Sequence, residues 1–600
     1  MNFRLITAFS AILAASLAGS SAYAGAPQAS AKKNAAAKKA APPSKPSVEE
    51  QIEALRRDLE NQIDSLKSDL AQKDAQLKQA QQTAADAQAA AAKAEAEAGA
   101  QQQAATENTA AVTTLQSTVN DLKANSTSLA TTISDETSEI KKAIASPDEI
   151  HIKGITLSPT GSFIAAETVW RQGATGGGIN TPFTGVPLQN SDAAQMTEFQ
   201  GTGRQSRLAL KAIGKLDKMT LTGYYEMDWL GTGITSNNNQ SNSYVLRQRQ
   251  LWADARMNNG WDFSGGQGWS LAAETTKGLQ RGSEILPATI DPQYEAGFVW
   301  TRQYSFRVSK DFNRKFFLGA SAENAQTLNP AGSNLPTNLL IGSAGNGGGL
   351  YNPTANYSFN LAPDFVAKMA FEPGWGHWEI FGISRFFRDR IYPNAGSSAG
   401  AYNDTIPGGG IGGGFRAPLA DKKVTIGLKG LYGKGVGRYG SSTIADVTIR
   451  PDGQLDPLKA FSALSTVELN PNPKLMVYLN YGGDYVYRDF WGKIGYGSPL
   501  TNMSGCNTET VTGSGATNGG IGYSPSTPAN CGGNTKDVQE GTAGWWYYFY
   551  KGPKGGLRQG FQYSYFTRNI WSGTGGPLNI NGGAKGTDNV IETSLRYYLP

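Results

Sequence analysis

The chain has 600 residues, of which 17% are charged, 10% are aromatic and 73 are glycine. Such a low share of charges argues against a row of ordinary soluble domains and indicates a β-rich chain whose uncharged polar side chains meet the water. Only two histidines, His151 and His377, are present and they lie far apart, so we expect no metal site, no cofactor and no enzyme activity.

The first 24 residues have the pattern of a secretory signal peptide. Arg4 precedes an apolar run at 5–17, and Ala22, Tyr23 and Ala24 form a cleavage site of the small-x-small type. After this segment no uninterrupted apolar stretch reaches about 18 residues, the length expected of a transmembrane helix. An exported chain of this kind could enter a membrane only as a closed β-barrel, because unpaired backbone groups are excluded from lipid.

Residues 25–46 are rich in alanine, lysine and proline and are predicted to form a disordered basic tail. Residues 47–147 have apolar positions at three- and four-residue spacings, which predicts a helix. The most regular heptad run pairs the positions of Val112, Val119, Ile133 and Ile140 with those of Leu115, Leu122 and Leu129. Because these stripes are narrow, we expect a coiled coil with other copies of the chain, either dimeric or trimeric; a solvated helical spacer is the alternative.

From residue 152 onward the apolar residues recur at a period of two. Within 219–229, for example, Leu221 and Tyr225 alternate with Thr222 and Glu226. One face of such a strand suits lipid and the other suits water, although a soluble sandwich would also alternate. Sixteen candidate strands lie near 160–170, 203–214, 218–230, 244–256, 267–277, 296–309, 315–326, 363–372, 376–390, 410–419, 422–434, 458–469, 474–487, 543–551, 556–570 and 589–599.

Short and long connections alternate between these strands, as in outer-membrane barrels with short periplasmic turns and long outer loops. We therefore predict an all-β transmembrane barrel of about 16 antiparallel strands at 152–600, in the outer membrane, with an N-terminal α-helical coiled-coil extension in the periplasm. The aromatic run at 545–550, together with Trp229, Trp252, Trp300 and Trp378, is predicted to supply the aromatic girdles.

Cys506 and Cys531 lie 25 positions apart in a segment rich in glycine, threonine, asparagine and serine. In an oxidising compartment they are expected to close this segment with a disulfide, since a redox-active pair is more often spaced as CxxC.

Three segments, 246–255, 363–372 and 428–439, together with the coiled-coil N-terminus, resemble the DcaP-like outer-membrane porins, which are trimeric 16-stranded channels related in style to the phosphate-selective porins. The resemblance implies a homotrimer and a diffusion channel for small anions such as dicarboxylates or phosphate. In many porins the third outer loop folds inward and narrows the pore. By that resemblance the loop at 278–295 would direct Arg281, Glu284, Asp291 and Glu295 toward a basic wall.

The charges of the lumen are expected to set the selectivity of such a channel. Residues 1–150 hold 15 Lys+Arg and 18 Asp+Glu of the chain's 54 and 49, so the remainder carries a net charge of about +8. Alternation places these basic residues on the lumen side: Arg207, Lys211, Arg247, Arg249, Arg307, Lys368, Arg385, Lys429, Arg558, Arg568 and Arg596. Arg247 and Arg249 share a face that a β-bulge could disturb. The acidic residues expected among them are Glu226, Asp228 and Glu592. For each basic residue, an ion pair within the wall is the alternative to contact with a solute.

A different class of function is a structural tether. The basic tail and the coiled coil would reach from an outer-membrane barrel to peptidoglycan, since a helix of this length extends roughly 150 Å. An adhesin would carry repeats outside the barrel, and we find none in the sequence. Nucleic acid is not an expected partner.

Overall fold

The computed structural model describes residues 150–600, except 176–177, 181–182, 232–243, 329, 343–357, 395, 510–529 and 577–582, and a few helical residues between 116 and 133. The predicted signal peptide, basic tail and nearly all of the predicted coiled coil lie outside the described residues. Val119, Leu122, Leu129 and Ile133 lie in the described helical part and are exposed in this single chain. Their packing against other copies stays a prediction.

Twenty strands are joined in one sheet, which closes on itself because β24 (Lys585–Tyr598) pairs with β3 (Phe163–Arg171). Four of the twenty are short, and the other sixteen form an antiparallel barrel wall, as predicted. The short strands are β1 (Ile150–Ile152), β2 (Ile155–Ser158), β4 (Glu198–Thr202) and β11 (Leu339–Leu340). Between β3 and β24 the wall strands are β5 (Arg207–Lys215), β6 (Met219–Gly231), β7 (Val245–Met257), β8 (Trp261–Trp269), β9 (Arg302–Phe312), β10 (Phe316–Glu323), β12 (Asp364–Phe371), β13 (His377–Ile391), β14 (Tyr402–Leu419), β15 (Val424–Lys434), β18 (Lys459–Asn472), β19 (Leu475–Val486), β22 (Thr535–Gly552) and β23 (Gly555–Ile570).

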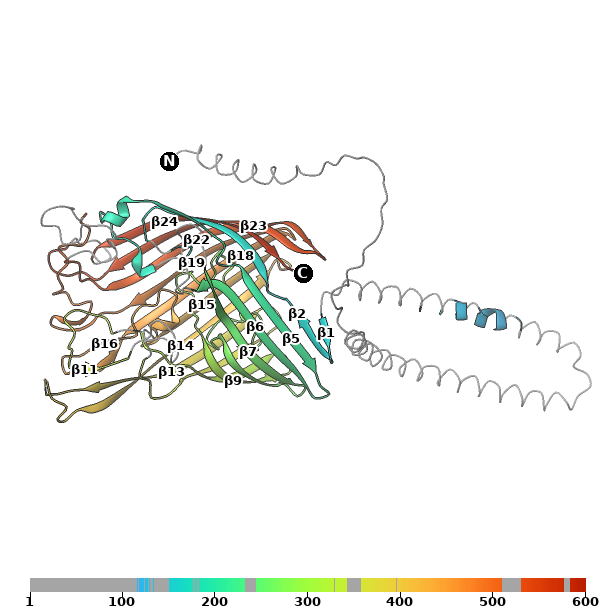
Figure 1. Cartoon of the computed structure of the whole chain (residues 1–600), viewed down its shortest axis with the longest axis horizontal. Coiled ribbons are helices and arrows are strands. Elements are labelled where there is room, and N and C mark those ends of the chain that lie inside the picture. The colour runs from blue at the N-terminus through green and yellow to red at the C-terminus, as the bar shows by residue number, and fades with distance from the viewer. Residues whose placement is uncertain are drawn as a thin grey trace, which may run out of the picture. The chain divides into compact units, whose positions relative to one another are not determined.

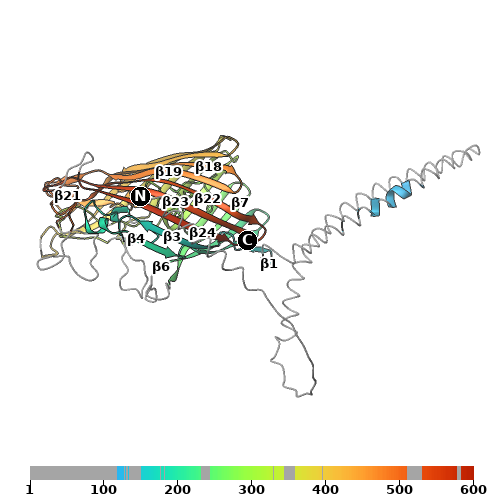
Figure 2. The same cartoon turned by 90° about the horizontal axis from the view of Figure 1, so that it is seen from above.

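Figure 1 shows the tilted wall strands with β5, β6 and β7 side by side, and Figure 2 shows the closure of the sheet along β22, β23, β24 and β3. Two small hairpins stand in the outer connections, β16 (Val447–Ile449) with β17 (Leu455–Pro457) and β20 (Asp489–Trp491) with β21 (Ile494–Tyr496). Three single-turn 3-10 helices, η1 (Phe183–Gly185), η2 (Asp192–Gln195) and η3 (Gly437–Tyr439), lie in the connections as well. No helix among the described residues is long and apolar enough to cross a membrane.

The wall exposes apolar side chains on its outer face and buries polar ones on its inner face. Along β12, Phe365, Met369 and Phe371 are about half exposed, whereas the alternating Asp364 and Lys368 are buried. The same outer face carries Ile164, Leu208, Leu210, Leu221, Leu251, Phe306, Ile380, Ile411, Leu428 and Leu479, all exposed. This arrangement is the reverse of a soluble domain and suits a barrel surrounded by lipid.

Alternation also corrects the predicted aromatic girdles. Trp545 and Tyr547 lie on the outer face, but Trp546 between them is buried on the lumen side and only 1% exposed. Trp252 is likewise buried, with its ring 5.3 Å from that of Tyr224. A continuous aromatic run in a strand necessarily sends every second ring inward.

The fifth predicted strand, 267–277, is wrong, because β8 spans Trp261–Trp269 and residues 270–301 form the next connection. The short turn before β8 includes Gly260 at φ +90°, where an added Cβ would lie 2.7 Å from the Asp311 carbonyl oxygen. Ser270, Leu271, Ala272 and Ala273 at the start of this connection are all buried, because they pack inside the barrel. Apolar residues buried in a connection therefore led to a false strand prediction.

The strand predicted at 410–419 is longer than expected, because β14 begins at Tyr402 and includes Gly408 and Gly409 in addition to the glycines of the predicted strand. These glycines let aromatic side chains of the neighbouring strand lie flat against the sheet. A Cβ at Gly412 would stand 2.2 Å from the ring of Phe381, and one at Gly408 would stand 2.5 Å from the ring of Phe387. Glycine at these positions thus reflects close approach rather than a turn.

The largest cluster of buried apolar residues lies inside the barrel. Phe317, Val366 and Phe381 of the inner wall pack there with Leu279 of the connection 270–301 and Tyr439 of the connection 435–458. Two long connections therefore fold into the lumen and supply the core that a 16-stranded wall alone would leave filled with water.

Cys506 and Cys531 form a disulfide in the long connection between β19 and β22. Cys506 is buried in a small cluster with Met503, Ile570 and Ala584, which anchors this connection to the end of β23.

We predict that replacing both cysteines with serine loosens this anchor. On the loop-entropy model, a cross-link between residues 25 positions apart stabilises the folded segment by roughly 3 kcal/mol. In the double variant, half-maximal cleavage within 487–534 by a protease should therefore occur at a lower urea concentration than in the wild type. Adding a reductant should lower the midpoint of the wild type and leave that of the variant unchanged. Equal midpoints for oxidised wild type and variant would contradict the prediction.

Candidate functional site

The connection 270–301 between β8 and β9 crosses the lumen. Near its start, the Thr275 hydroxyl lies 3.1 Å from Nε2 of His377 on β13. Further along, the indole Nε1 of Trp546 on β22 donates to the Ala288 carbonyl at 2.7 Å. Contacts with inward-facing side chains on widely separated strands place this segment inside the barrel, as the porin resemblance implied. We call it the lumen loop.

The lumen loop contains the four residues predicted at the constriction, and two of them contact the wall of β8 and β9. Arg281 donates from Nε to Ser264 Oγ at 2.9 Å and from Nη2 to the Ser305 carbonyl at 3.3 Å. Glu284 forms an ion pair with Arg307 at 3.0 Å, so it does face a basic residue of the wall. Both contacts hold the first half of the lumen loop in place.

The expectation for Glu295 is wrong, because it faces carboxyl groups instead of bases. Glu295 is fully buried, and its charged neighbours are Glu540 on β22 and Glu592 on β24. The adjacent backbone is tied to the same wall, since the Ala296 amide donates to Glu540 Oε2 at 2.8 Å and the Gly297 amide donates to Asp484 Oδ2 at 3.2 Å. Backbone amides, which the sequence pattern does not show, are thus the partners of these wall acids.

Asp291, the fourth predicted residue, lies where acidic and basic neighbours meet. Burial and the Glu167 carboxylate raise the pKa of Asp291 to about 7, against the opposing effect of Arg249, Arg596 and Arg247. Burial and the neighbouring glutamates also raise the pKa of Glu295 well above its ordinary value.

Most of the predicted pore-lining bases are held in ion pairs on the lumen side of the wall. Six of them have at most 5% of the side chain exposed, so they neutralise buried acids and are not available to solutes. The pairs are Arg249 with Glu226, Arg307 with Glu284, Lys368 and Lys429 with Glu379, Arg385 with Asp364 and Asp446, and Arg596 with Glu167. For these six the ion-pair alternative is correct.

Four arginines lie close together on one side of the wall. We call it the arginine cluster: Arg207 on β5, Arg247 and Arg249 on β7 and Arg302 on β9, around the acids Glu226 and Asp228 on β6. Arg247 grips Asp228 with two hydrogen bonds of 3.0 and 2.8 Å, and Arg249 Nε lies 2.6 Å from Glu226 Oε1. Arg207 lies 3.5 Å from Glu226.

The arginine cluster has four guanidinium groups around the carboxylates of Glu226 and Asp228, and Asp291 of the lumen loop is a third acidic neighbour of Arg247 and Arg249. The side chains of Arg207 and Arg247 are 20% and 35% exposed, whereas both acids are buried. The β6–β7 register shifts between Glu226 and Met227, and this bulge lets Arg247, Arg249 and Gln250 all face the acids. The bulge we had considered for this pair is therefore present.

Three predicted bases have no carboxylate within 4.0 Å in the described part of the chain: Lys211, Arg558 and Arg568. The Arg558 guanidinium lies between two rings, 3.9 Å from the centroid of Trp546 and 4.7 Å from that of Tyr598. Arg568 donates to the Val186 carbonyl and to Thr535, which ties the first outer connection to β23.

Arg302 was missed by sequence reasoning. It donates to Gln293 Oε1 of the lumen loop at 3.0 Å, and its guanidinium stacks near Trp269 and Trp300. The predicted strand began at 296, whereas β9 begins at Arg302, so this residue stands where the lumen loop joins the strand and its hydrogen bond is to the loop.

His377 belongs to a network that joins β13 to the lumen loop. Its Nδ1 lies 2.8 Å from Glu372, and its Nε2 lies 3.0 Å from Glu379, which is also paired with Lys368. Thr275 is 1% exposed, and its hydroxyl donates to the Gly278 carbonyl. The network fixes the start of the lumen loop to β13.

No family model and no curated protein matches the chain. Among solved structures, the chain is similar to the outer membrane channel DcaP of Acinetobacter baumannii, with 14% identity over 74% of this chain and 97% of that chain and a TM-score of 0.48. It is also similar to an anion-selective porin from Comamonas acidovorans, at 9% identity, 74% and 98% coverage and a TM-score of 0.36. OmpF of Salmonella typhi, solved with daunomycin, matches at 10% identity, 75% and 99% coverage and a TM-score of 0.37. The DcaP channel is thus one of the proteins this chain resembles in structure, as its sequence segments indicated.

We predict that the backbone amides of the lumen loop are protected from hydrogen exchange more strongly at low pH than at high pH. The raised pKa values of Asp291 and Glu295 mean that the seated loop favours their neutral forms, so it loses stability as pH rises through about 7. Amide protection in 286–298, corrected for intrinsic exchange, should fall between pH 5 and pH 8 in the wild type.

The variant Asp291→Asn should show a smaller fall, because its side chain stays neutral. Asp452→Asn changes the same charge at an exposed position of an outer connection and should behave as the wild type. An undiminished fall in the Asp291 variant would contradict the assignment.

Proposed function

We propose that the protein is an outer-membrane porin, a passive diffusion channel for small hydrophilic solutes that prefers anions such as dicarboxylates or phosphate. The observation that carries this proposal is the arginine cluster. Its surplus guanidinium groups and the partial exposure of Arg207 and Arg247 give the lumen a positive region beside the lumen loop.

The apolar outer face supports placement in a membrane, and the asymmetry of the connections supports an orientation. In this placement the short turns, such as 216–218 and 553–554, face the periplasm, and the long connections face outward. The N-terminal extension then enters the periplasm, and we propose that its coiled coil belongs to a homotrimer, as the DcaP-like resemblance implies.

Because most charges of the lumen are paired, a modest surplus of positive charge can set the selectivity of the channel for anions. The buried acids of the wall are largely matched by bases or by loop amides, so their field largely cancels within short distances. The guanidinium groups of the arginine cluster outnumber their acids, and arginine matches the geometry of a carboxylate or a phosphate with two parallel hydrogen bonds. An anion entering the lumen meets this region, and also Lys211 and Arg558, which have no carboxylate partner.

Selective passage further requires that binding stays weak. Arg247 and Arg207 keep contact with Asp228 and Glu226, and these acids compete with a passing anion for the same donors. Such competition lowers the residence time of a solute at each position, which favours conduction over tight binding.

We predict that the double variant Arg207→Gln with Arg247→Gln loses anion preference. The chloride-to-potassium permeability ratio, from zero-current potentials across a salt gradient in a planar bilayer, should fall several-fold toward unity, because the potential of a charged cleft depends on its surplus charge. With potassium succinate in place of chloride the same direction is expected.

The control is Arg388→Gln with Arg390→Gln, which removes the same charge from positions that alternate with the buried lumen residues of β13. Its permeability ratio should stay close to that of the wild type. A ratio that is unchanged in the first variant, or changed equally in the control, would contradict the role of the arginine cluster.

A further inference from the structure

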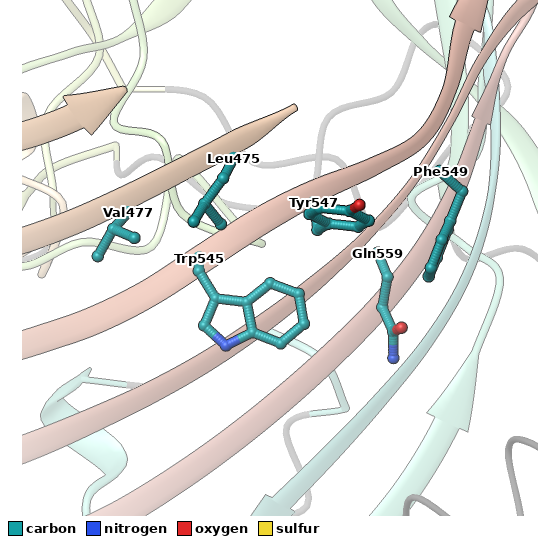
Figure 3. Close-up of a pocket in the computed structure, with 6 residues that line it drawn as sticks. All are labelled: Leu475, Val477, Trp545, Tyr547, Phe549 and Gln559. Carbon is teal, nitrogen blue, oxygen red and sulfur yellow. The ribbon is translucent and has the colours of Figure 1, made fainter. Parts of the chain in front are cut away.

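An open apolar groove of about 420 Å³ lies on the outer face of the wall, where β19, β22 and β23 run side by side (Figure 3). Its volume falls within the roughly 300–1,000 Å³ typical of small-ligand sites. Six residues line it, five of them apolar or aromatic: Leu475, Val477, Trp545, Tyr547, Phe549 and Gln559.

Strand pairing brings these residues onto one face. Leu475 pairs with Tyr547, and Val477 pairs with Trp545. The register shift between Tyr548 and Tyr550 places Phe549 beside Tyr547, with ring centroids 5.5 Å apart. Figure 3 shows the rings of Trp545, Tyr547 and Phe549 following one another along β22. The groove is therefore a row of rings with an aliphatic wall on one side and the Gln559 amide on the other.

The groove ends at two short turns that carry lysines. Lys474 directly precedes β19, and Lys554 lies in the turn between β22 and β23; both are exposed. Neither has a carboxylate within 4.0 Å among the described residues.

Several other short turns at the same end of the barrel are basic. Their exposed bases are Lys215, Lys218, Arg314, Lys315, Lys422 and Lys423, whereas the exposed carboxylates there are Asp217 and Asp421; Lys551 adds a further base next to the turn of Lys554. This positive surplus favours a negatively charged partner at this rim.

We propose that the groove binds an anionic phospholipid of the periplasmic leaflet. An acyl chain lies along the three rings of β22, and Lys474 and Lys554 supply positive charge for the headgroup. The ligand must be an amphiphile. The groove itself has only one amide as a polar group, and the charged side chains stand only at one end of it. This inference rests on the proposed membrane placement, which puts the short turns at the periplasmic side.

A second copy of this chain is a poorer occupant. Copies related by an axis along the membrane normal present their short turns at the same height, so a copy docked at this basic turn would bring no negative charge to Lys474 and Lys554, and the proposed homotrimer would use another part of the outer face. A phospholipid with a net negative headgroup instead supplies the missing charge, and each lysine near such a surface contributes measurably to binding.

The test uses the full chain, purified in detergent and examined by native mass spectrometry with dioleoyl phosphatidylglycerol or dioleoyl phosphatidylcholine. We expect the wild type to retain phosphatidylglycerol in preference to phosphatidylcholine. The variant Lys474→Gln with Lys554→Gln should bind phosphatidylglycerol about 30-fold more weakly, the factor expected for two lysines. The control Lys422→Gln with Lys423→Gln removes the same charge from another turn and should retain the lipid as the wild type does.

A further variant, Trp545→Ala, should weaken retention of both lipids while the barrel keeps its heat resistance in gel electrophoresis. Equal retention of the two lipids by the wild type, or an equal loss in the control, would overturn the proposal. Dissociation of the oligomer by Trp545→Ala would also overturn it, in favour of a contact between subunits. The conductance of the same samples in a bilayer separates the proposed lipid site from the proposed channel function. A protein that retains the lipid but does not conduct ions would contradict only the channel function.

Discussion

The fold depends on one constraint, that every backbone N–H and C=O group of the wall must be paired within the protein if the wall is to face lipid. Pairing of β24 with β3 meets this constraint by leaving no open edge. Once the sheet is closed, alternation divides each strand between two environments, and the outer one accepts Phe365 and Met369 while the inner one accepts Asp364 and Lys368. The charged residues of the chain are thereby gathered in the lumen.

Gathering charges in a confined space creates a second requirement, because an unpaired buried charge is strongly destabilising. The wall meets it in two ways. Ion pairs join strands that are neighbours, as between Lys368 and Glu379, and loop amides occupy other acids, as at Glu540. The lumen loop is therefore part of the charge balance of the wall. Bases exceed acids in the arginine cluster, and Lys211, Arg558 and Arg568 also have no carboxylate within 4.0 Å in the part of the chain that the structure describes.

The wall could be predicted from the sequence because period-two alternation and short polar turns are local signals. The prediction was wrong where a different environment produces the same signal, as at 267–277, where the lumen loop is buried without being a strand, and at β14, where glycines accommodate Phe381 and Phe387. The site was less accessible to sequence reasoning. Alternation indicates that Arg385 faces the lumen, but its partner Asp446 lies 61 positions away in a connection that folds inward, and no local pattern joins them. Arg302 was missed for a related reason, because its contacts are set by the lumen loop and do not follow from its position in β9.

The most direct test of this account is the conductance and zero-current potential of the wild-type protein in a planar bilayer with a salt gradient. We expect stepwise conductance in groups of three and a potential of the sign that indicates anion preference, because the lumen keeps a surplus of guanidinium groups beside the lumen loop. A folded barrel that conducts no ions, or one that prefers cations, would contradict the account.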